Sequence, residues 1–133
     1  MSKASFSGVH HVALNVRDLD ASVRWYSEVL DFAPLIPWDT DDFERRIMRH
    51  PSGVVVALTR HRHPEAGAEF EEHVTGLDHL ALTVDSRAEL DAWEARLTEA
   101  GVIHSGVRVT PRTGFTLIAF RDPDSIQLEL YLA

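Results

Sequence analysis

The sequence contains no cysteine, which excludes disulfide bonds, thiolate metal sites and cysteine nucleophiles. It has no apolar run approaching the length of a membrane span, and residues 1–6 (MSKASF) lack the apolar core of a signal peptide. Basic residues are scarce: 13 Lys and Arg against 21 Asp and Glu give a formal charge of −8. This charge argues against a nucleic-acid partner, which usually requires a basic face. We therefore expect a globular cytoplasmic protein that binds neither membrane nor nucleic acid.

The most informative feature that is present is an internal repeat. Residues 8–16 (GVHHVALNV) match residues 76–84 (GLDHLALTV) at a constant offset of 68, and Trp25 and Trp93 keep the same offset. A repeat of this length predicts two copies of one supersecondary unit related by a pseudo-twofold axis. Such an axis would bring His11 and His79 close together.

The length of 133 residues fits one domain, predicted over residues 5–133. Its first module covers about residues 7–60, its linker residues 61–75 and its second module residues 76–133.

Each module is predicted to have the order βαβββ. In the first, these elements cover residues 8–16, 18–30, 32–38, 43–49 and 54–60, and the last two strands flank a turn at residues 50–53. In the second, they cover residues 77–84, 86–100, 102–109, 115–121 and 126–132, with the turn at residues 122–125. Asp18 or Asp20 is expected to cap the first helix and Ser86 the second, which Gly101 closes.

Strand alternation places three potential metal ligands on the same type of face: His11, His79 and Glu129. Two imidazoles and one carboxylate form a ligand set that leaves coordination positions open. Glu129 lies between Leu128 and Leu130, where an unpaired carboxylate would be costly. The equivalent position of the first module, 72 residues earlier, is Ala57. The alternative is that each histidine merely fills a half-buried strand position.

The remaining histidines are weaker candidates. Alternation turns His10 to the face opposite His11, so it is expected to be a packing or surface residue. His61, His63 and His73 fall in the predicted linker, where solvated loop positions are the alternative to a proton shuttle that folds over the site.

A mostly apolar substrate pocket is expected around the metal, suited to a flat ligand. The predicted pocket residues are Asn15, Ala57, Phe115, Ala119, Gln127 and Tyr131. Arg45, Arg49 and Arg121 share the parity of this face and either hold a ligand carboxylate or are solvated hairpin ends.

These motifs resemble the vicinal oxygen chelate superfamily, which includes glyoxalase I, bleomycin-resistance proteins, fosfomycin-resistance transferases and extradiol dioxygenases. The pattern H-x-A-L-x-V opens each module at His11 and His79, and D-P-D-x-x-x-L-E-L closes the second at residues 122–130. The resemblance implies an α+β fold in which two βαβββ modules form an open, cup-shaped, eight-stranded mixed sheet with helices outside. It also implies His11, His79 and Glu129 as metal ligands, and a homodimer.

Departures from the family patterns narrow the reaction. Glyoxalase-like and epimerase-like members usually carry a fourth ligand where this chain has Ala57, and fosfomycin transferases have Thr and Tyr where it has Ala13 and Ala119. Extradiol dioxygenases keep the same three ligands, although they also usually have a Tyr at the position of Ala119.

The sequence therefore predicts a divalent-metal enzyme acting on a small organic substrate, dioxygenase-like, with Fe²⁺ favoured and Mn²⁺, Ni²⁺, Co²⁺ or Zn²⁺ as other ions. A glyoxalase-like lyase or isomerase and a metal-free, bleomycin-resistance-like binding protein are the alternatives, and no catalytic acid or base is assigned.

Overall fold

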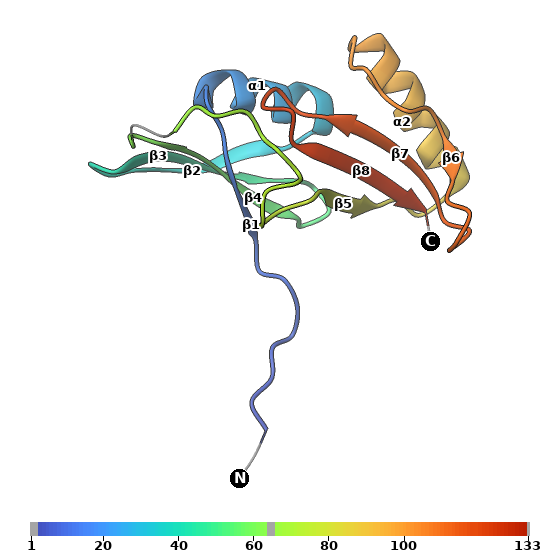
Figure 1. Cartoon of the computed structure of the whole chain (residues 1–133), viewed down its shortest axis with the longest axis horizontal. Coiled ribbons are helices and arrows are strands. Elements are labelled where there is room, and N and C mark those ends of the chain that lie inside the picture. The colour runs from blue at the N-terminus through green and yellow to red at the C-terminus, as the bar shows by residue number, and fades with distance from the viewer. Residues whose placement is uncertain (1–2, 64–65, 133) are drawn as a thin grey trace. The chain divides into compact units, whose positions relative to one another are not determined.

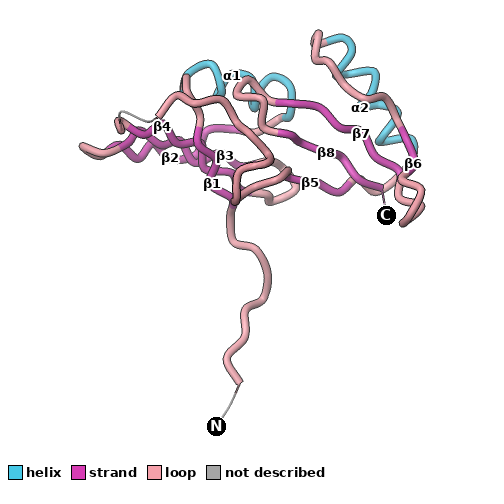
Figure 2. The backbone as a smooth tube through the Cα atoms, in the orientation of Figure 1, coloured by secondary structure: helices cyan, strands magenta, loops and turns pink. Residues whose placement is uncertain are grey.

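The computed structural model describes residues 3–63 and 66–132, which contain two helices and two four-stranded sheets (Figure 1). The chain divides between residues 67 and 68 into two compact units. Each unit has the order βαβββ, so the predicted α+β fold of two such modules is confirmed. The backbone trace shows the same succession of strand, helix and three strands in each unit (Figure 2). None of the helices among the described residues has the length and apolar character that a membrane span requires.

The first unit consists of one helix and one mixed sheet. Its elements are β1 (Val12–Asn15), α1 (Leu19–Leu30), β2 (Ala33–Asp39), β3 (Phe43–Arg49) and β4 (Val55–His61). The strands are ordered β1-β4-β3-β2, with β1 parallel to β4 and the other pairs antiparallel. The parallel pair is possible because the whole of α1, β2 and β3 serves as the crossover between its strands.

Helix α1 packs on β3 and β4. Asp18 caps its first turn, since its Oδ1 accepts a hydrogen bond from the backbone N–H of Ala21 at 3.0 Å. Tyr26 and Leu30 are buried on the helix, and Leu58 and Met48 are fully buried on the sheet. Alternation therefore turns one face of this sheet toward the helix, and the other face, called the open face, is not covered by the helix of this unit.

The second unit repeats this topology. Its elements are β5 (Leu80–Thr83), α2 (Arg87–Glu99), β6 (Arg108–Val109), β7 (Thr116–Arg121) and β8 (Gln127–Leu132), and its strands are ordered β5-β8-β7-β6. Helix α2 contacts β7 and β8 and contributes Leu90 and Leu97 to the core, where they meet the helix-facing side chains of the sheet such as Ile118. Ser86 caps the helix through Oγ, which accepts from the N–H of Glu89 at 3.1 Å, and Gly101 follows it with a φ of 73°.

The opening strand of each unit is shorter than predicted. β1 begins at Val12 rather than residue 8, and β5 at Leu80 rather than residue 77. The register explains the difference: Val12 pairs with Val56 and Leu80 with Leu128, so earlier residues would face the hairpin turn that precedes β4 or β8. A strand needs an extended, hydrogen-bonded neighbour, which a tight turn does not provide.

Two further predictions were wrong in their bounds. The strand expected over residues 102–109 is reduced to Arg108–Val109, with one isolated bridge from His104 to Phe120. Gly106 has a φ of 71°, which interrupts extended backbone, and the Ser105 hydroxyl accepts from the N–H of Ala119. His61 was assigned to the linker but is the last residue of β4, where it pairs with Phe43.

Replacing the cap of α1 tests the local account of this helix. Asp18→Ala should lower the free energy of unfolding by about 1 kcal/mol, because the Ala21 N–H loses its acceptor. Urea denaturation followed by circular dichroism measures the change. Asp20→Ala, in the first turn of α1, is the matched control and should cost less, since the higher helix propensity of alanine offsets the lost interaction with the helix dipole. Equal losses in both variants would contradict the capping role.

Candidate metal centre

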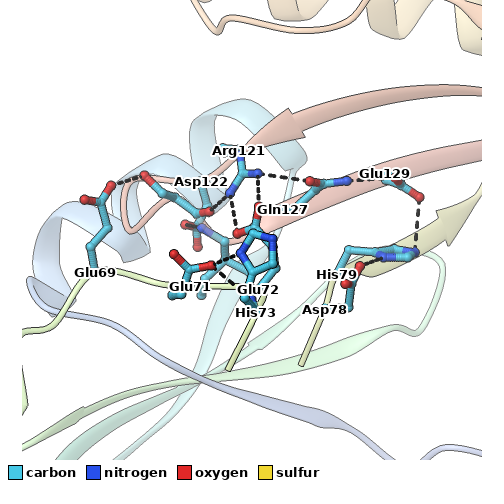
Figure 3. Close-up of polar contacts among 12 residues, drawn as sticks. Glu69, Glu71, Glu72, His73, Asp78, His79, Arg121, Asp122, Gln127 and Glu129 are labelled. Atoms are coloured by element: carbon cyan, nitrogen blue, oxygen red, sulfur yellow. Dashed lines mark hydrogen bonds and ion pairs between the residues drawn. The ribbon is translucent and has the colours of Figure 1, made fainter. Parts of the chain in front are cut away.

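The second unit brings His79 and Glu129 together. Glu129 lies in the middle of β8 beside Ala81 of β5, and its side chain is only 7% exposed. Leu128 and Leu130 flank it and are buried on the helix side of the sheet, so alternation puts Glu129 on the open face. His79 directly precedes β5, and its Nε2 lies 3.2 Å from Oε2 of Glu129 (Figure 3).

This contact lacks the geometry of a hydrogen bond, and Oε2 of Glu129 is buried without a hydrogen-bond partner among the described residues. A buried carboxylate oxygen in that state carries an uncompensated desolvation cost. A proton shared with His79 or a cation held between the two groups would remove this cost. The pair therefore has the donor chemistry of a divalent metal site, one imidazole nitrogen and one carboxylate oxygen.

Asp78 fixes the other side of the His79 ring. Its Oδ1 lies 2.6 Å from Nδ1 of His79, so Nδ1–H is assigned as donor to this carboxylate. The neutral ring then has its lone pair on Nε2, the atom that faces Glu129. A carboxylate on the far nitrogen is a common way to orient a metal-binding histidine and raise its basicity.

A chain of hydrogen bonds holds the second oxygen of Glu129. Nε2 of Gln127 donates to Oε1 of Glu129 at 3.0 Å, and Oε1 of Gln127 accepts from Nη2 of Arg121 at 3.1 Å (Figure 3). Arg121 also donates to Glu72 at 3.0 Å and to the carbonyl of Ser125 at 2.8 Å. Oε1 of Glu129 thus has a hydrogen-bond donor within the protein, whereas Oε2 has none among the described residues.

These contacts change the interpretation of Arg121 and Gln127. Arg121 was a candidate to hold a ligand carboxylate, but the structure pairs it with Glu72, whose hydrogen bond from Arg121 keeps the pKa of that carboxyl below its ordinary value. Gln127 was expected in the substrate pocket, and both ends of its amide are engaged by protein groups.

His11 belongs to the first unit, where it directly precedes β1. Its Nδ1 lies 2.8 Å from Nδ1 of His10, and the two rings meet edge to face. The prediction that His10 turns away from His11 was therefore wrong, because residues 10 and 11 lie before the regular strand and alternation does not apply there. In the repeat, His10 is equivalent to Asp78, so each of the two histidines is contacted at Nδ1 by the residue before it. This role was not predicted from the sequence, although His10 and Asp78 occupy the same position of the repeat.

The predicted pocket residues are divided between the two units. In the first, Ala57 is buried beside Ala13, and the amide oxygen of Asn15 accepts from Nε2 of His61 at 3.0 Å. In the second, Ala119 pairs with Glu129 across the β7–β8 ladder. The rings of Phe115 and Tyr131 are in edge-to-face contact there, 6.1 Å between centroids.

Two other features were not predicted. Glu71, Glu72 and His73 have ligand atoms within 4.8 Å of one another. They are engaged otherwise, Glu72 with Arg121 and Glu71 with His73, and the hydrogen bond that His73 donates to the Glu71 carboxylate raises the pKa of His73. A surface pocket at the start of α1 is lined by Arg17, Asp18, Leu19, Asp20, Glu44, Arg46 and Arg60. Its arginines at positions 46 and 60 are paired with carboxylates, so it lacks the character of a metal or substrate site.

The comparison with family models places the whole repeat in one family. Residues 8–130 match the model of the Glyoxalase/Bleomycin resistance protein/Dioxygenase superfamily. The chain belongs to this superfamily. The expected resemblance is thereby confirmed over both βαβββ units.

Individual members of the superfamily are similar over most of this chain. YaeR of Escherichia coli (strain K12) is 30% identical, over 92% of this chain and 94% of that protein. Catechol-2,3-dioxygenase of Bacillus subtilis (strain 168) is also 30% identical over 92% of this chain, which spans only 40% of that enzyme.

Solved structures of superfamily members have the same fold. A glyoxylase/bleomycin resistance protein/dioxygenase domain from Frankia sp. EAN1pec is 40% identical with a TM-score of 0.88, covering 97% of this chain and 99% of that chain. A variant of the fosfomycin resistance protein FosX from Listeria monocytogenes, solved with Mn(II) and 1S,2S-dihydroxypropylphosphonic acid, has a TM-score of 0.71 at 20% identity, covering 96% of this chain and 90% of that chain.

The ion pair between Glu72 and Arg121 can be tested by measuring the stability of the fold as a function of pH. The lowered pKa of Glu72 means that its pair with Arg121 stabilises the fold above the ordinary pKa of a glutamate and is lost as pH falls through the lower folded-state pKa. Glu72→Gln should therefore be less stable than the wild type at neutral pH, and the two should converge in acid.

A double-mutant cycle with Arg121→Gln, measured by thermal melting, isolates the pair from other effects. The coupling should shrink at high salt, because both side chains are partly exposed. A coupling that persists unchanged in acid, where Glu72 is protonated, would show that the ion pair is not its source.

Proposed function

We propose that this protein is a divalent-metal-dependent enzyme that acts on a small organic substrate, with His11, His79 and Glu129 as the protein ligands of the ion. The observation that carries the proposal is the buried Oε2 of Glu129, which faces Nε2 of His79 without a hydrogen bond. A neutral imidazole lone pair and a carboxylate oxygen repel each other at this distance unless a positive charge lies with them. We include His11 as a ligand because it occupies the same position of the repeat as His79.

The ligand set favours chemistry that needs open coordination positions. Two neutral imidazoles and one carboxylate occupy three positions of a divalent ion and suit Fe²⁺ as well as Mn²⁺, Co²⁺, Ni²⁺ or Zn²⁺. When bound, such an ion acts as a Lewis acid toward two neighbouring oxygens of a substrate. We favour Fe²⁺ and an oxygenation, because the three ligands are those of extradiol dioxygenases and catechol-2,3-dioxygenase is among the similar proteins.

The protein residues around the ligands have defined tasks in this proposal. Asp78 keeps the proton of His79 on Nδ1, so that Nε2 stays available as a ligand. Gln127 holds Oε1 of Glu129, which fixes the plane of the carboxylate and leaves Oε2 to coordinate. The neighbouring side chains Ala119 and Leu117 are apolar and keep water from the carboxylate, which strengthens its attraction for a cation.

The ligand role of Glu129 predicts a sharp difference between two glutamates. Glu129→Gln should weaken binding of Mn²⁺ or Fe²⁺, because two neutral histidines leave the charge of the ion uncompensated. Loss of a residue that only supports a ligand weakens metal binding by up to about a hundredfold, so the loss of a ligand should exceed that factor. Glu71→Gln is the matched control, since Glu71 belongs to the exposed acidic cluster and should leave the affinity unchanged.

Elemental analysis of protein purified without chelator, together with calorimetric titration, measures both variants. Metal lost from Glu71→Gln and retained by Glu129→Gln would move the site to the exposed cluster. A wild-type protein that neither carries nor rebinds a divalent ion would leave the metal-free binding protein as the correct description.

The reaction itself is tested by oxygen uptake. Fe²⁺-loaded protein should consume dioxygen only when a catechol is added, and Glu129→Gln loaded in the same way should not. An oxygen electrode with a panel of substituted catechols, run beside an anaerobic control, measures the rate. Turnover of hemithioacetals without oxygen uptake would assign the protein to the glyoxalase-like lyases instead.

A further inference from the structure

The open face of the sheet in the first unit carries an arginine that is held in place but has no counter-ion. Cross-strand pairing places Trp38, Arg45, Thr59 and Asn15 in one row across β2, β3, β4 and β1. This row lies next to the row that contains Ala57 and Ile47.

Three contacts fix the guanidinium group of Arg45. Its Cζ lies 4.2 Å from the ring centroid of Phe43 and 5.2 Å from that of Trp38. Its Nε donates to Oγ1 of Thr59 at 2.9 Å, and Thr59 is buried at 1% exposure. Most of the side-chain entropy that ligand binding would cost is therefore already lost in the folded protein.

The charge of Arg45 is not neutralised within the part of the chain that the structure describes. Nearby arginines are paired with carboxylates: Arg46 with Asp39, and Arg60 and Arg62 with Glu44. No ion pair joins Arg45 to an acid among residues 3–63 and 66–132. The strand positions of the same face, from Asn15 to His61, include no Asp or Glu, although the chain carries a net charge of −8.

We propose that Arg45, backed by Trp38 and Phe43, binds the carboxylate group of a small organic acid. With Nε engaged by Thr59, the two terminal nitrogens offer a planar fork that matches a carboxylate in bidentate geometry. Trp38 is 51% exposed and presents ring surface to the apolar part of the same ligand.

A single arginine at this site favours a carboxylate, which carries one negative charge, over a phosphate, which carries up to two. Arg49 is the other arginine at a strand position of this face, four residues along β3, and a strand rises about 3.3 Å per residue. It therefore lies too far away to bind the same group, and one positive charge matches a monoanion. That this ligand is the substrate rests on the proposed function, whereas the binding of a carboxylate does not.

The experiment titrates metal-free protein with benzoate and with benzamide, its neutral isostere, and follows the indole N–H of Trp38 and the Nε–H of Arg45 by heteronuclear NMR. Benzoate should shift both signals saturably at millimolar concentrations, and benzamide should not. Arg45→Gln should weaken benzoate binding at least about tenfold, as expected for loss of a charge-assisted hydrogen-bonded pair. Arg45→Lys keeps the positive charge but loses the planar pair of terminal nitrogens, so its affinity for benzoate should lie between that of the wild type and that of Arg45→Gln.

Arg60→Gln is the matched control, because it removes one positive charge from the helix-facing side of the same sheet and should leave benzoate affinity unchanged. Thermal melting confirms that each variant is folded. The proposal is overturned if wild-type protein shows no saturable shift, if benzamide binds as well as benzoate, or if Arg60→Gln loses as much affinity as Arg45→Gln.

The variant Glu129→Gln separates this inference from the proposed function. Retained benzoate binding in a variant that has lost its metal supports the Arg45 site independently. If the wild-type protein binds metal through Glu129 but does not bind benzoate, the Arg45 site is wrong and the proposed metal site is unaffected.

Discussion

A carboxylate that is buried in an apolar strand has to be compensated, and this constraint organises the polar groups of the second unit. Glu129 cannot move to solvent, because Leu128 and Leu130 on either side are fixed in the core beneath α2. Gln127 compensates one oxygen and is itself held by Arg121 and, through it, by Glu72. The other oxygen faces His79, whose ring is held from behind by Asp78. These polar contacts thus surround Oε2 of Glu129, a buried oxygen that has no hydrogen-bond partner among the described residues.

The two units show how a duplicated module can divide its tasks. Their strand order and pairing are the same, so residues of β3 and β4 occupy places on their sheet equivalent to those of the residues 72 positions later in β7 and β8. Where the second unit has Glu129, the first has Ala57. Where the first has Arg45 hydrogen-bonded to Thr59, the second has Leu117 beside Tyr131. The open face of the second unit therefore carries the acidic Glu129, and the open face of the first unit carries Arg45, which forms no ion pair among the described residues.

The fold was largely predictable, because it rests on signals that act over short distances. Period-2 alternation located the strands, and the caps Asp18 and Ser86 located both helix starts. Strand ends were less predictable, since they depend on where the partner strand begins; β1 could not extend back to residue 8 once Val12 paired with Val56. The short β6 likewise reflects Gly106 and a side-chain hydrogen bond from a different strand.

By itself the sequence determined the repeat, the fold class and the candidate ligands, because a fixed offset and strand parity are properties of the chain alone. Only the tertiary structure decided which polar groups contact one another. In the structure Arg121 pairs with Glu72, and Gln127 donates to Glu129. The rings of His10 and His11 are in contact, and Arg45 contacts two aromatic rings but no acid among the described residues. Such contacts depend on side-chain rotamers and on loops between strands, which parity does not constrain. The chemistry of the open faces was therefore set by packing, on a scaffold that the sequence pattern had already specified.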